Sequence, residues 1–235
     1  MDNSQDMRLV ESLLASNRAL FVGAHPDDIE FRAGGLVHLL RRRGAEVIFV
    51  IATRGGKRLR WPLNRLLERI RSSNQLRAAR ILGGAEVVLR DYPDGGLPSH
   101  IDSFAEDLKS LIEQRKPDVV LCWDPEFVSH PHPDHKAAAD AAAAACSDKL
   151  GKLDVGVCFY GAPRPNLWVA LDDGAVRAKI KSIRAHATEA PWPYFDLRGK
   201  RWLLSWMRAE GAKVGAEYAE SFRVRLTPPH PPSSP

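Results

Sequence analysis

The stretch Leu20-Phe21-Val22-Gly23-Ala24-His25-Pro26-Asp27-Asp28 is an apolar run that ends in a histidine and two carboxylates. Its first four residues predict a buried strand, so the polar side chains would stand at the carboxyl end of that strand. In open α/β sheets this edge is where ligands bind. Imidazole and carboxylate groups suit zinc, and one of two adjacent carboxylates can bind a cation while the other stays available as a base.

A second cluster of the same residue types lies far downstream. An aspartate before a helix is typical of an N-cap, so the first cluster alone has an ordinary structural explanation. However, His130-Pro131-His132-Pro133-Asp134-His135 follows another strand-like run, at 119–123. Helix capping does not account for two such clusters at the ends of two strands. Together they predict a metal site.

Apolar runs alternate with segments of helical spacing through most of the chain. We expect strands near 19–25, 46–53, 85–90, 118–123, 155–160, 167–171 and 221–226. We expect helices near 6–16, 36–44, 63–82, 101–115, 133–146, 174–187 and 198–218. This alternation predicts an α/β fold, a doubly wound and mostly parallel sheet with helices on both faces. Gly34 and Gly35 are expected to let the backbone approach the site closely.

The length of 235 residues fits one large α/β domain. We expect this domain over residues 1–227 and a proline-rich, disordered tail over 228–235. No run approaches the ~20 apolar residues of a membrane span, and no signal peptide is recognisable. Cys122, Cys146 and Cys158 stand in apolar surroundings and predict core residues of a cytoplasmic protein. A homo-oligomer is left open.

The formal net charge is +5, and much of the surplus lies at 41–43 and 54–71. A solvated basic face is the usual reason for such runs. The alternative is attraction of an anionic substrate, with Arg54 and Lys57 binding its phosphate or carboxylate. Nucleic acid is not an expected partner, because aromatic residues do not interleave regularly with the basic ones and no known module is present.

The two clusters also carry a family resemblance. Ala-His-Pro-Asp-Asp at 24–28, with His-Pro-Asp-His at 132–135, resembles the LmbE-like (PIG-L) deacetylases. Segments such as Ile81-Leu82-Gly83, Pro93-Asp94-Gly95 and the run 216–222 fall in the order that the family shows. The resemblance implies a Rossmann-like fold and a zinc-dependent enzyme that acts on N-acetylglucosamine groups of small-molecule amino sugar conjugates.

The resemblance also implies roles for individual residues. His25, Asp28 and His135 would be the zinc ligands, and Asp27 would be the general base. His132 would stabilise an oxyanion as a cationic imidazole, and Asp134 would orient it. Chemistry supports these roles, because three protein ligands leave zinc an open position for water, whose pKa zinc lowers to about 7.

Three more residues are candidates for substrate contact. Arg71 matches a family arginine that faces the substrate, although a solvated helix face is equally consistent with the sequence. Asp94 either caps a turn or, as in the family, lies near the sugar. His186 begins the segment His186-Ala187-Thr188-Glu189, where the family has His-x-Ser-Gln. The loop after the second strand, Thr53-Arg54-Gly55-Gly56-Lys57, lacks an acid that relatives often carry, so the substrate pocket is expected to differ.

Three functions are therefore compared. The leading one is zinc-dependent hydrolysis of the amide of an N-acyl sugar. A zinc-binding but catalytically inert module is the second, and the presence of both Asp27 and His132 argues against it. A metal-dependent phosphoesterase is the third, but that chemistry usually needs two metals about 4 Å apart and more carboxylates.

Overall fold

The computed structural model describes residues 3–126, 132–147 and 156–225. His130, Pro131 and the expected tail at 228–235 lie outside these residues. Within them, the strands are β1 (Arg18–Gly23), β2 (Glu46–Thr53), β3 (Glu86–Tyr92), β4 (Val119–Trp123), β5 (Gly156–Tyr160), β6 (Leu167–Ala170) and β7 (Ala219–Arg225). The longer helices are α1 (Asn3–Leu14), α2 (Asp28–Arg42), α3 (Leu63–Ile81), α4 (Ile101–Arg115), α5 (Pro133–Cys146), α6 (Asp173–Ala185) and α7 (Lys200–Gly211).

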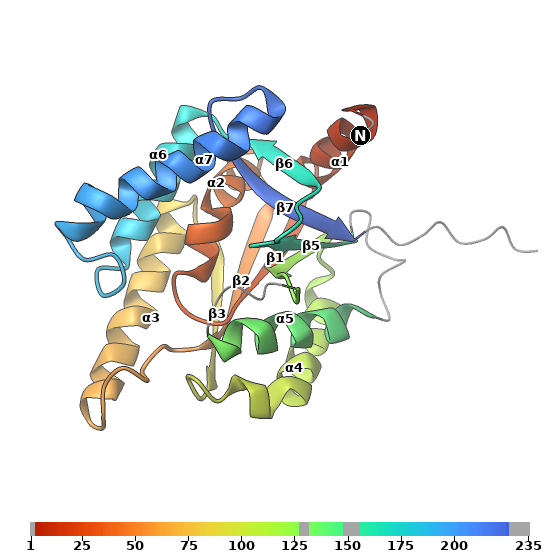
Figure 1. Cartoon of the computed structure of the whole chain (residues 1–235). Coiled ribbons are helices and arrows are strands. Elements are labelled where there is room, and N and C mark those ends of the chain that lie inside the picture. The colour runs from red at the N-terminus through yellow and green to blue at the C-terminus, as the bar shows by residue number, and fades with distance from the viewer. Residues whose placement is uncertain (1–2, 127–131, 148–155, 226–235) are drawn as a thin grey trace, which may run out of the picture.

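The described strands form one sheet in the order β3-β2-β1-β4-β5-β7-β6 (Figure 1). The strands β3, β2, β1, β4 and β5 pair in parallel. The strand β7 runs antiparallel to both β5 and β6. The prediction of a doubly wound, mostly parallel α/β sheet is therefore confirmed.

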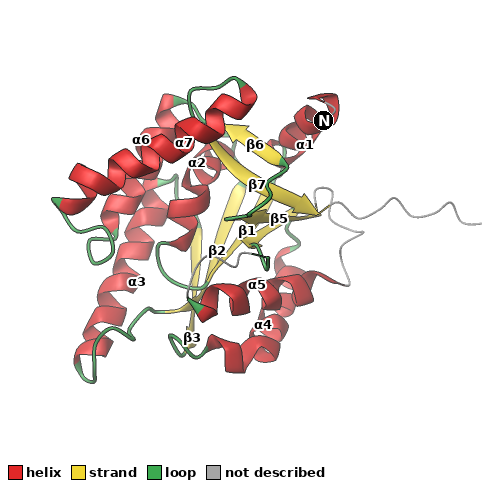
Figure 2. Ribbon diagram, in the orientation of Figure 1, coloured by secondary structure: helices red, strands yellow, loops and turns green. Residues whose placement is uncertain are grey.

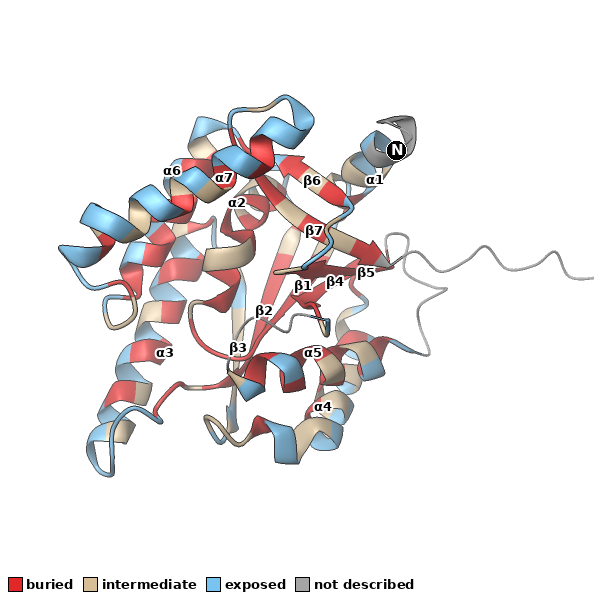
Figure 3. Ribbon diagram, in the orientation of Figure 1, coloured by how far each residue is buried: buried red, intermediate tan, exposed pale blue. Residues whose placement is uncertain are grey.

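Helices cover both faces of the sheet (Figure 2). Phe21 and Phe49 point into the core shared with α1, α2 and α3. Their neighbours Leu20 and Ile48 point into the core shared with α4 and α5. This alternation follows from the two-residue period of a strand, and it explains why the central strands are buried on both sides (Figure 3). A third core lies between α6 and α7, and residues of α2 pack against it.

The strand order reverses direction between β1 and β4. From β1 the chain crosses to β2 on one side, whereas from β4 it crosses to β5 on the other. The carboxyl ends of β1 and β4 are neighbours because Val22 pairs with Cys122. Such a switch point opens a crevice for ligands. The first His/Asp cluster leaves the end of β1, and the described part of the second, residues 132–135, lies at the start of α5, the helix after β4.

Two expectations about local structure were wrong. The helix α2 begins at Asp28, so Gly34 and Gly35 lie inside it and not at the site. A Cβ atom on Gly35 would meet Leu171 at 2.6 Å, and one on Gly34 would meet Lys179 at 3.2 Å. These glycines therefore allow close packing between α2 and the α6 layer. The last helix was expected to run to residue 218, but α7 ends at Gly211.

The expectation that the three cysteines are core residues is confirmed. Cys122, Cys146 and Cys158 are buried. No helix in the described ranges is long and apolar enough to cross a membrane.

Candidate metal centre and active-site cavity

Three buried side chains from the two clusters converge at the switch point. His25 follows β1, Asp28 opens α2 and His135 lies in the first turn of α5. His135 Nε2 lies 3.2 Å from His25 Nδ1 and 3.1 Å from Asp28 Oδ1. Two donors about 2.1 Å from a tetrahedral zinc ion stand about 3.4 Å apart. The three donors therefore fit one zinc ion, and they are among the groups of the described residues that could hold a metal.

The carboxylate of Asp28 is fixed by its other oxygen. Oδ2 accepts hydrogen bonds from the backbone amides of Ala24 and His25, at 2.8 and 3.0 Å, and from Trp123 Nε1 at 3.0 Å. The Trp123 ring also stacks on His135, with centroids 4.3 Å apart. Burial would raise the pKa of Asp28, but His135, His25 and the Trp123 bond hold it well below its usual range. Asp28 is therefore an ionised carboxylate with its Oδ1 directed at His135.

His25 is oriented by carboxylates on its other ring nitrogen. Its Nε2 lies 3.2 Å from Asp94 Oδ1 and 3.3 Å from Asp134 Oδ2. Burial would lower the pKa of His25, but hydrogen bonds with Asp134 and Asp94 raise it to about 10. A metal ligand must be deprotonated, so a metal ion at Nδ1 competes with a proton on this ring. A carboxylate on the remote nitrogen of a histidine ligand is common around metals.

His132 completes a second group of possible donors, with His25, Asp94 and Asp134. In this group Asp134 already accepts from the amides of Gly95 and Leu97, and Asp94 accepts from the amide of Lys57. These carboxylates are therefore partly satisfied by backbone. They also lie 3.2 and 3.3 Å from His25 Nε2 and 3.9 Å from ring nitrogens of His132, and the two rings meet edge-on with centroids 4.4 Å apart.

Asp27 stands beside the three donors in an unusual backbone conformation. Its φ is 102°, in the left-handed region that is uncommon for residues other than glycine. Its Oδ1 lies 3.6 Å from Arg71 Nη2. Burial, and next the charge of Asp28, raise the pKa of Asp27 to about 7. A carboxyl group with a pKa near the working pH is suited to general base catalysis.

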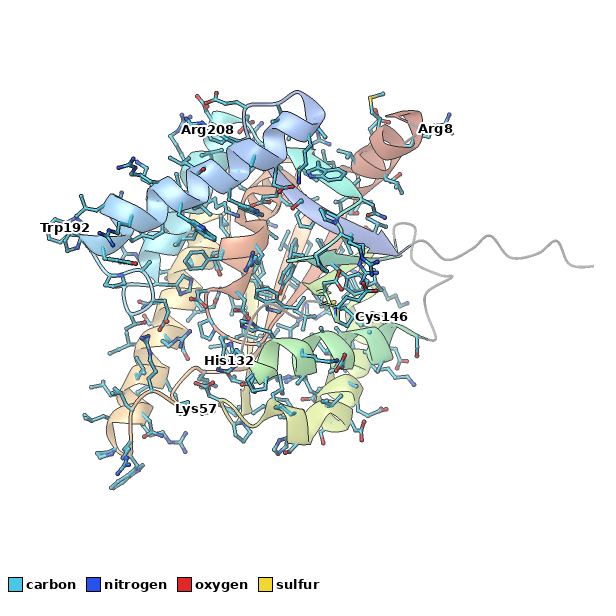
Figure 4. All side chains as sticks on the ribbon, viewed as in Figure 1. Arg8, Lys57, His132, Cys146, Trp192 and Arg208 are labelled. Carbon is cyan, nitrogen blue, oxygen red and sulfur yellow. The ribbon has the colours of Figure 1, made fainter. Side chains whose placement is uncertain are left out.

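A cavity of about 730 Å³ contains the site. The donors His25, Asp28 and His135 line it together with Asp27, His132 and Asp94. One part of its wall is charged and comes from Lys57, Arg58, Arg71 and Glu189, and another is aromatic and comes from Phe31, Trp202 and Trp206. Figure 4 labels two members of this wall, His132 and Lys57. The volume is in the usual range for a small-molecule site.

A model of the PIG-L family, described as GlcNAc-PI de-N-acetylase, matches residues 20–146. The chain belongs to the PIG-L family. The resemblance carried by residues 24–28 and 132–135 is thereby confirmed. The diacetylchitobiose deacetylase of Thermococcus kodakarensis is 26% identical over 93% of this chain and 86% of its own length.

Solved structures share the fold. The N,N'-diacetylchitobiose deacetylase from Pyrococcus horikoshii, in complex with an inhibitor, matches with a TM-score of 0.80 and 24% identity, over 96% of this chain and 93% of that one. The 4-carboxy-2-hydroxymuconate hydratase GalB from Pseudomonas putida matches with a TM-score of 0.71 and 21% identity, over 93% of this chain and 100% of that one. A deacetylase and a hydratase thus have this fold, so the site must decide the reaction.

Three of the five predicted substrate contacts of this PIG-L protein lie in the cavity wall, and two do not. Lys57, Arg71 and Asp94 line the cavity. Arg54 pairs with Asp91 and donates to Ser72, and it lines a neighbouring depression instead. His186 is 1% exposed and lies 3.6 Å from Glu30, so it does not reach a ligand in the cavity. Both placements differ from the predicted contacts.

Sequence reasoning missed part of the wall. The sequence predicts no role for Glu189, yet its carboxylate accepts from Arg58 at 2.6 Å and lies 3.3 Å from Arg71. Trp202 and Trp206 were not singled out either. Their spacing of four places both on one face of a helix, which is the signal that could have found them.

Proposed function

We propose that this protein is a zinc-dependent N-deacetylase that removes the acyl group of an N-acetylglucosamine-type amino sugar conjugate. One observation carries the proposal: the donors of His25, Asp28 and His135 converge on one point beside Asp27, a carboxylate outside the ligand set. Three ligands leave zinc a fourth position, as catalytic sites require. When bound there, zinc would polarise the amide carbonyl and acidify a water molecule.

Side chains around the donors would carry out proton transfer and oxyanion stabilisation. Asp27, with its pKa raised to about 7, takes a proton from the attacking water and returns it to the leaving amine. His132 donates a hydrogen bond to the oxyanion that develops from the carbonyl. Burial, and next the charge of His25, lower the pKa of His132. His25 is neutral when it binds a metal, so burial is the effect that favours a neutral His132, and we propose that His132 donates as N–H in place of the cation expected from the sequence.

The cavity wall suits an amino sugar. Lys57, Arg58 and Glu189 offer charged partners for hydroxyl groups or for an anionic substituent. Phe31, Trp202 and Trp206 offer apolar faces to the carbon-bound hydrogens of a sugar ring or its aglycone. Polar groups that fix orientation within an otherwise apolar wall are typical of small-molecule sites.

The other two functions lack this support. A phosphoesterase with two metals about 4 Å apart needs a second full ligand set, whereas both donor groups of the described residues share His25. An inert binding module has no need of Asp27 and His132 beside the ligands. The number of metal ions bound per chain tests the phosphoesterase alternative, and acetate release tests the inert binding module.

The direct test is a screen of acetate release by the purified protein with N-acetylglucosamine, N,N'-diacetylchitobiose and N-acetylglucosaminyl inositol. We expect release from at least one, its loss on treatment with a chelator, and its recovery on adding zinc. Bis(p-nitrophenyl) phosphate serves as the control substrate. Phosphate ester hydrolysis without acetate release would overturn the proposal.

A further inference from the structure

The peptide bond between Pro26 and Asp27 is held at both of its polar atoms by α3. Arg71 Nη2 donates to the carbonyl oxygen of Pro26 at 2.9 Å. Gln75 Oε1 accepts from the backbone amide of Asp27 at 3.1 Å. Arg71 and Gln75 are four residues apart on one helix face, and both are buried. One peptide group is thus clamped by successive turns of α3, at the position where the backbone takes its left-handed conformation.

A second row of buried groups fixes the amide of Gln75. Its Nε2 donates to Glu30 Oε1 at 2.7 Å, and Glu30 Oε2 lies 3.6 Å from His186 Nε2. Glu30 and Gln75 are 0% exposed. A carboxylate only accepts and a backbone amide only donates, so the Gln75 amide has one orientation that satisfies both neighbours. Neither Glu30 nor Gln75 can touch a substrate in the cavity.

Asp28, the proposed metal ligand that follows Asp27 in the chain, is held by different groups. Asp28 receives its hydrogen bonds from Ala24, His25 and Trp123, none of which belongs to α3. The α3 clamp therefore acts on Asp27 separately from the metal donors. Catalytic groups need their geometry fixed within about 0.5 Å.

We propose that Gln75 and Glu30 are positioning residues that set the direction of the Asp27 carboxylate by fixing the Pro26–Asp27 peptide. The inference rests on the proposed function, in which Asp27 is the general base. It makes Gln75 and Glu30 necessary for the rate of the chemical step and unnecessary for metal binding.

The first test is Gln75→Leu. Leucine is similar in size to glutamine but cannot form the hydrogen bonds with the Asp27 amide and with Glu30. We expect kcat to fall about 10- to 100-fold, because small misplacements of a catalytic group have effects of this order. KM and zinc content should stay close to those of the wild type. Gln114→Leu makes the same substitution at an exposed position of α4, and it should leave every value unchanged.

The second test exchanges the two groups. Gln75→Glu alone places two carboxylates against each other and should reduce kcat. The double variant Glu30→Gln with Gln75→Glu restores the pattern, because the carboxylate then at position 75 would accept from both the Asp27 amide and the side-chain amide then at position 30. We expect kcat to recover to within a fewfold of the wild type. If Glu30 and Gln75 only fill space, the double variant should not regain the kcat that Gln75→Glu loses.

A readout independent of activity is hydrogen exchange of the Asp27 amide. We expect faster exchange in Gln75→Leu and renewed protection in the double variant, at unchanged zinc content and unfolding temperature. Loss of zinc in Gln75→Leu, wild-type kcat in that variant, or no gain of the double variant over Gln75→Glu would each overturn the inference. An inactive wild type would contradict the proposed function instead, and the exchange data would still test the clamp.

Discussion

His25 uses its two ring nitrogens for different partners. Nδ1 faces His135 and the metal position, whereas Nε2 lies between Asp94 and Asp134. Asp28 divides its two oxygens in the same way between the metal position and hydrogen-bond donors. Each proposed ligand is therefore oriented through the atom that it would not offer to the metal, which is how surrounding groups usually orient metal ligands.

His135→Ala tests the ligand set at the scale of the residue. The substitution leaves two ligands, so we expect marked loss of zinc from about one ion per chain, measured by elemental analysis. His38→Ala, on α2 and outside the cavity wall, is the control and should keep its zinc. Undiminished zinc in His135→Ala would remove His135 from the site.

The loop between β2 and α3 contributes to the cavity through Lys57 and Arg58, and not through Arg54. Lys57→Ala should raise KM of an anionic substrate by about two- to fivefold at low salt, since exposed charge pairs contribute little. The effect should shrink at high salt because screening weakens exposed charges. Arg54→Ala is the matched control and should leave KM unchanged, because Arg54 pairs with Asp91. Equal effects of both substitutions would contradict this assignment.

The helix α6 is capped by Asp172, whose Oδ1 accepts from the amide of Ala175 at 2.8 Å. That bond, and next the one from Arg42, lower the pKa of Asp172. The cap therefore stabilises the fold above the ordinary pKa of aspartate, about 3.9, and the stabilisation is lost as the pH falls through the lowered pKa.

Asp172→Ala should reduce the free energy of unfolding by about 1 kcal/mol at neutral pH, which lowers Tm by about 2–4 °C. The difference in Tm between this variant and the wild type should become smaller at acidic pH. Asp173→Ala changes the adjacent exposed aspartate and should have a smaller effect. Thermal unfolding followed by circular dichroism at several pH values measures both, and a constant difference down to acidic pH would contradict the linkage.

At the scale of the whole molecule, the switch point between β1 and β4 joins clusters that lie more than 100 residues apart in the chain. The sequence predicts this part well, because each cluster comes after a strongly apolar strand and at the start of a helix. The contacts of Gln75 with Glu30 and with the Asp27 amide could not be predicted, since they depend on how α3 packs beside α2. The same holds for Arg54 and His186, which contact Asp91 and Glu30 and do not line the cavity. Gly34 and Gly35 were misassigned because nothing local shows that α6 packs against them.

The central claim is that Asp28 binds the metal and that its neighbour Asp27 acts as the base. The most direct measurement is zinc content and acetate release on one preparation of Asp27→Asn. An amide cannot accept the proton of water, so we predict about one zinc per chain and a rate reduced by roughly two to four orders of magnitude. Loss of zinc with Asp28 intact, or a rate close to that of the wild type, would contradict the account.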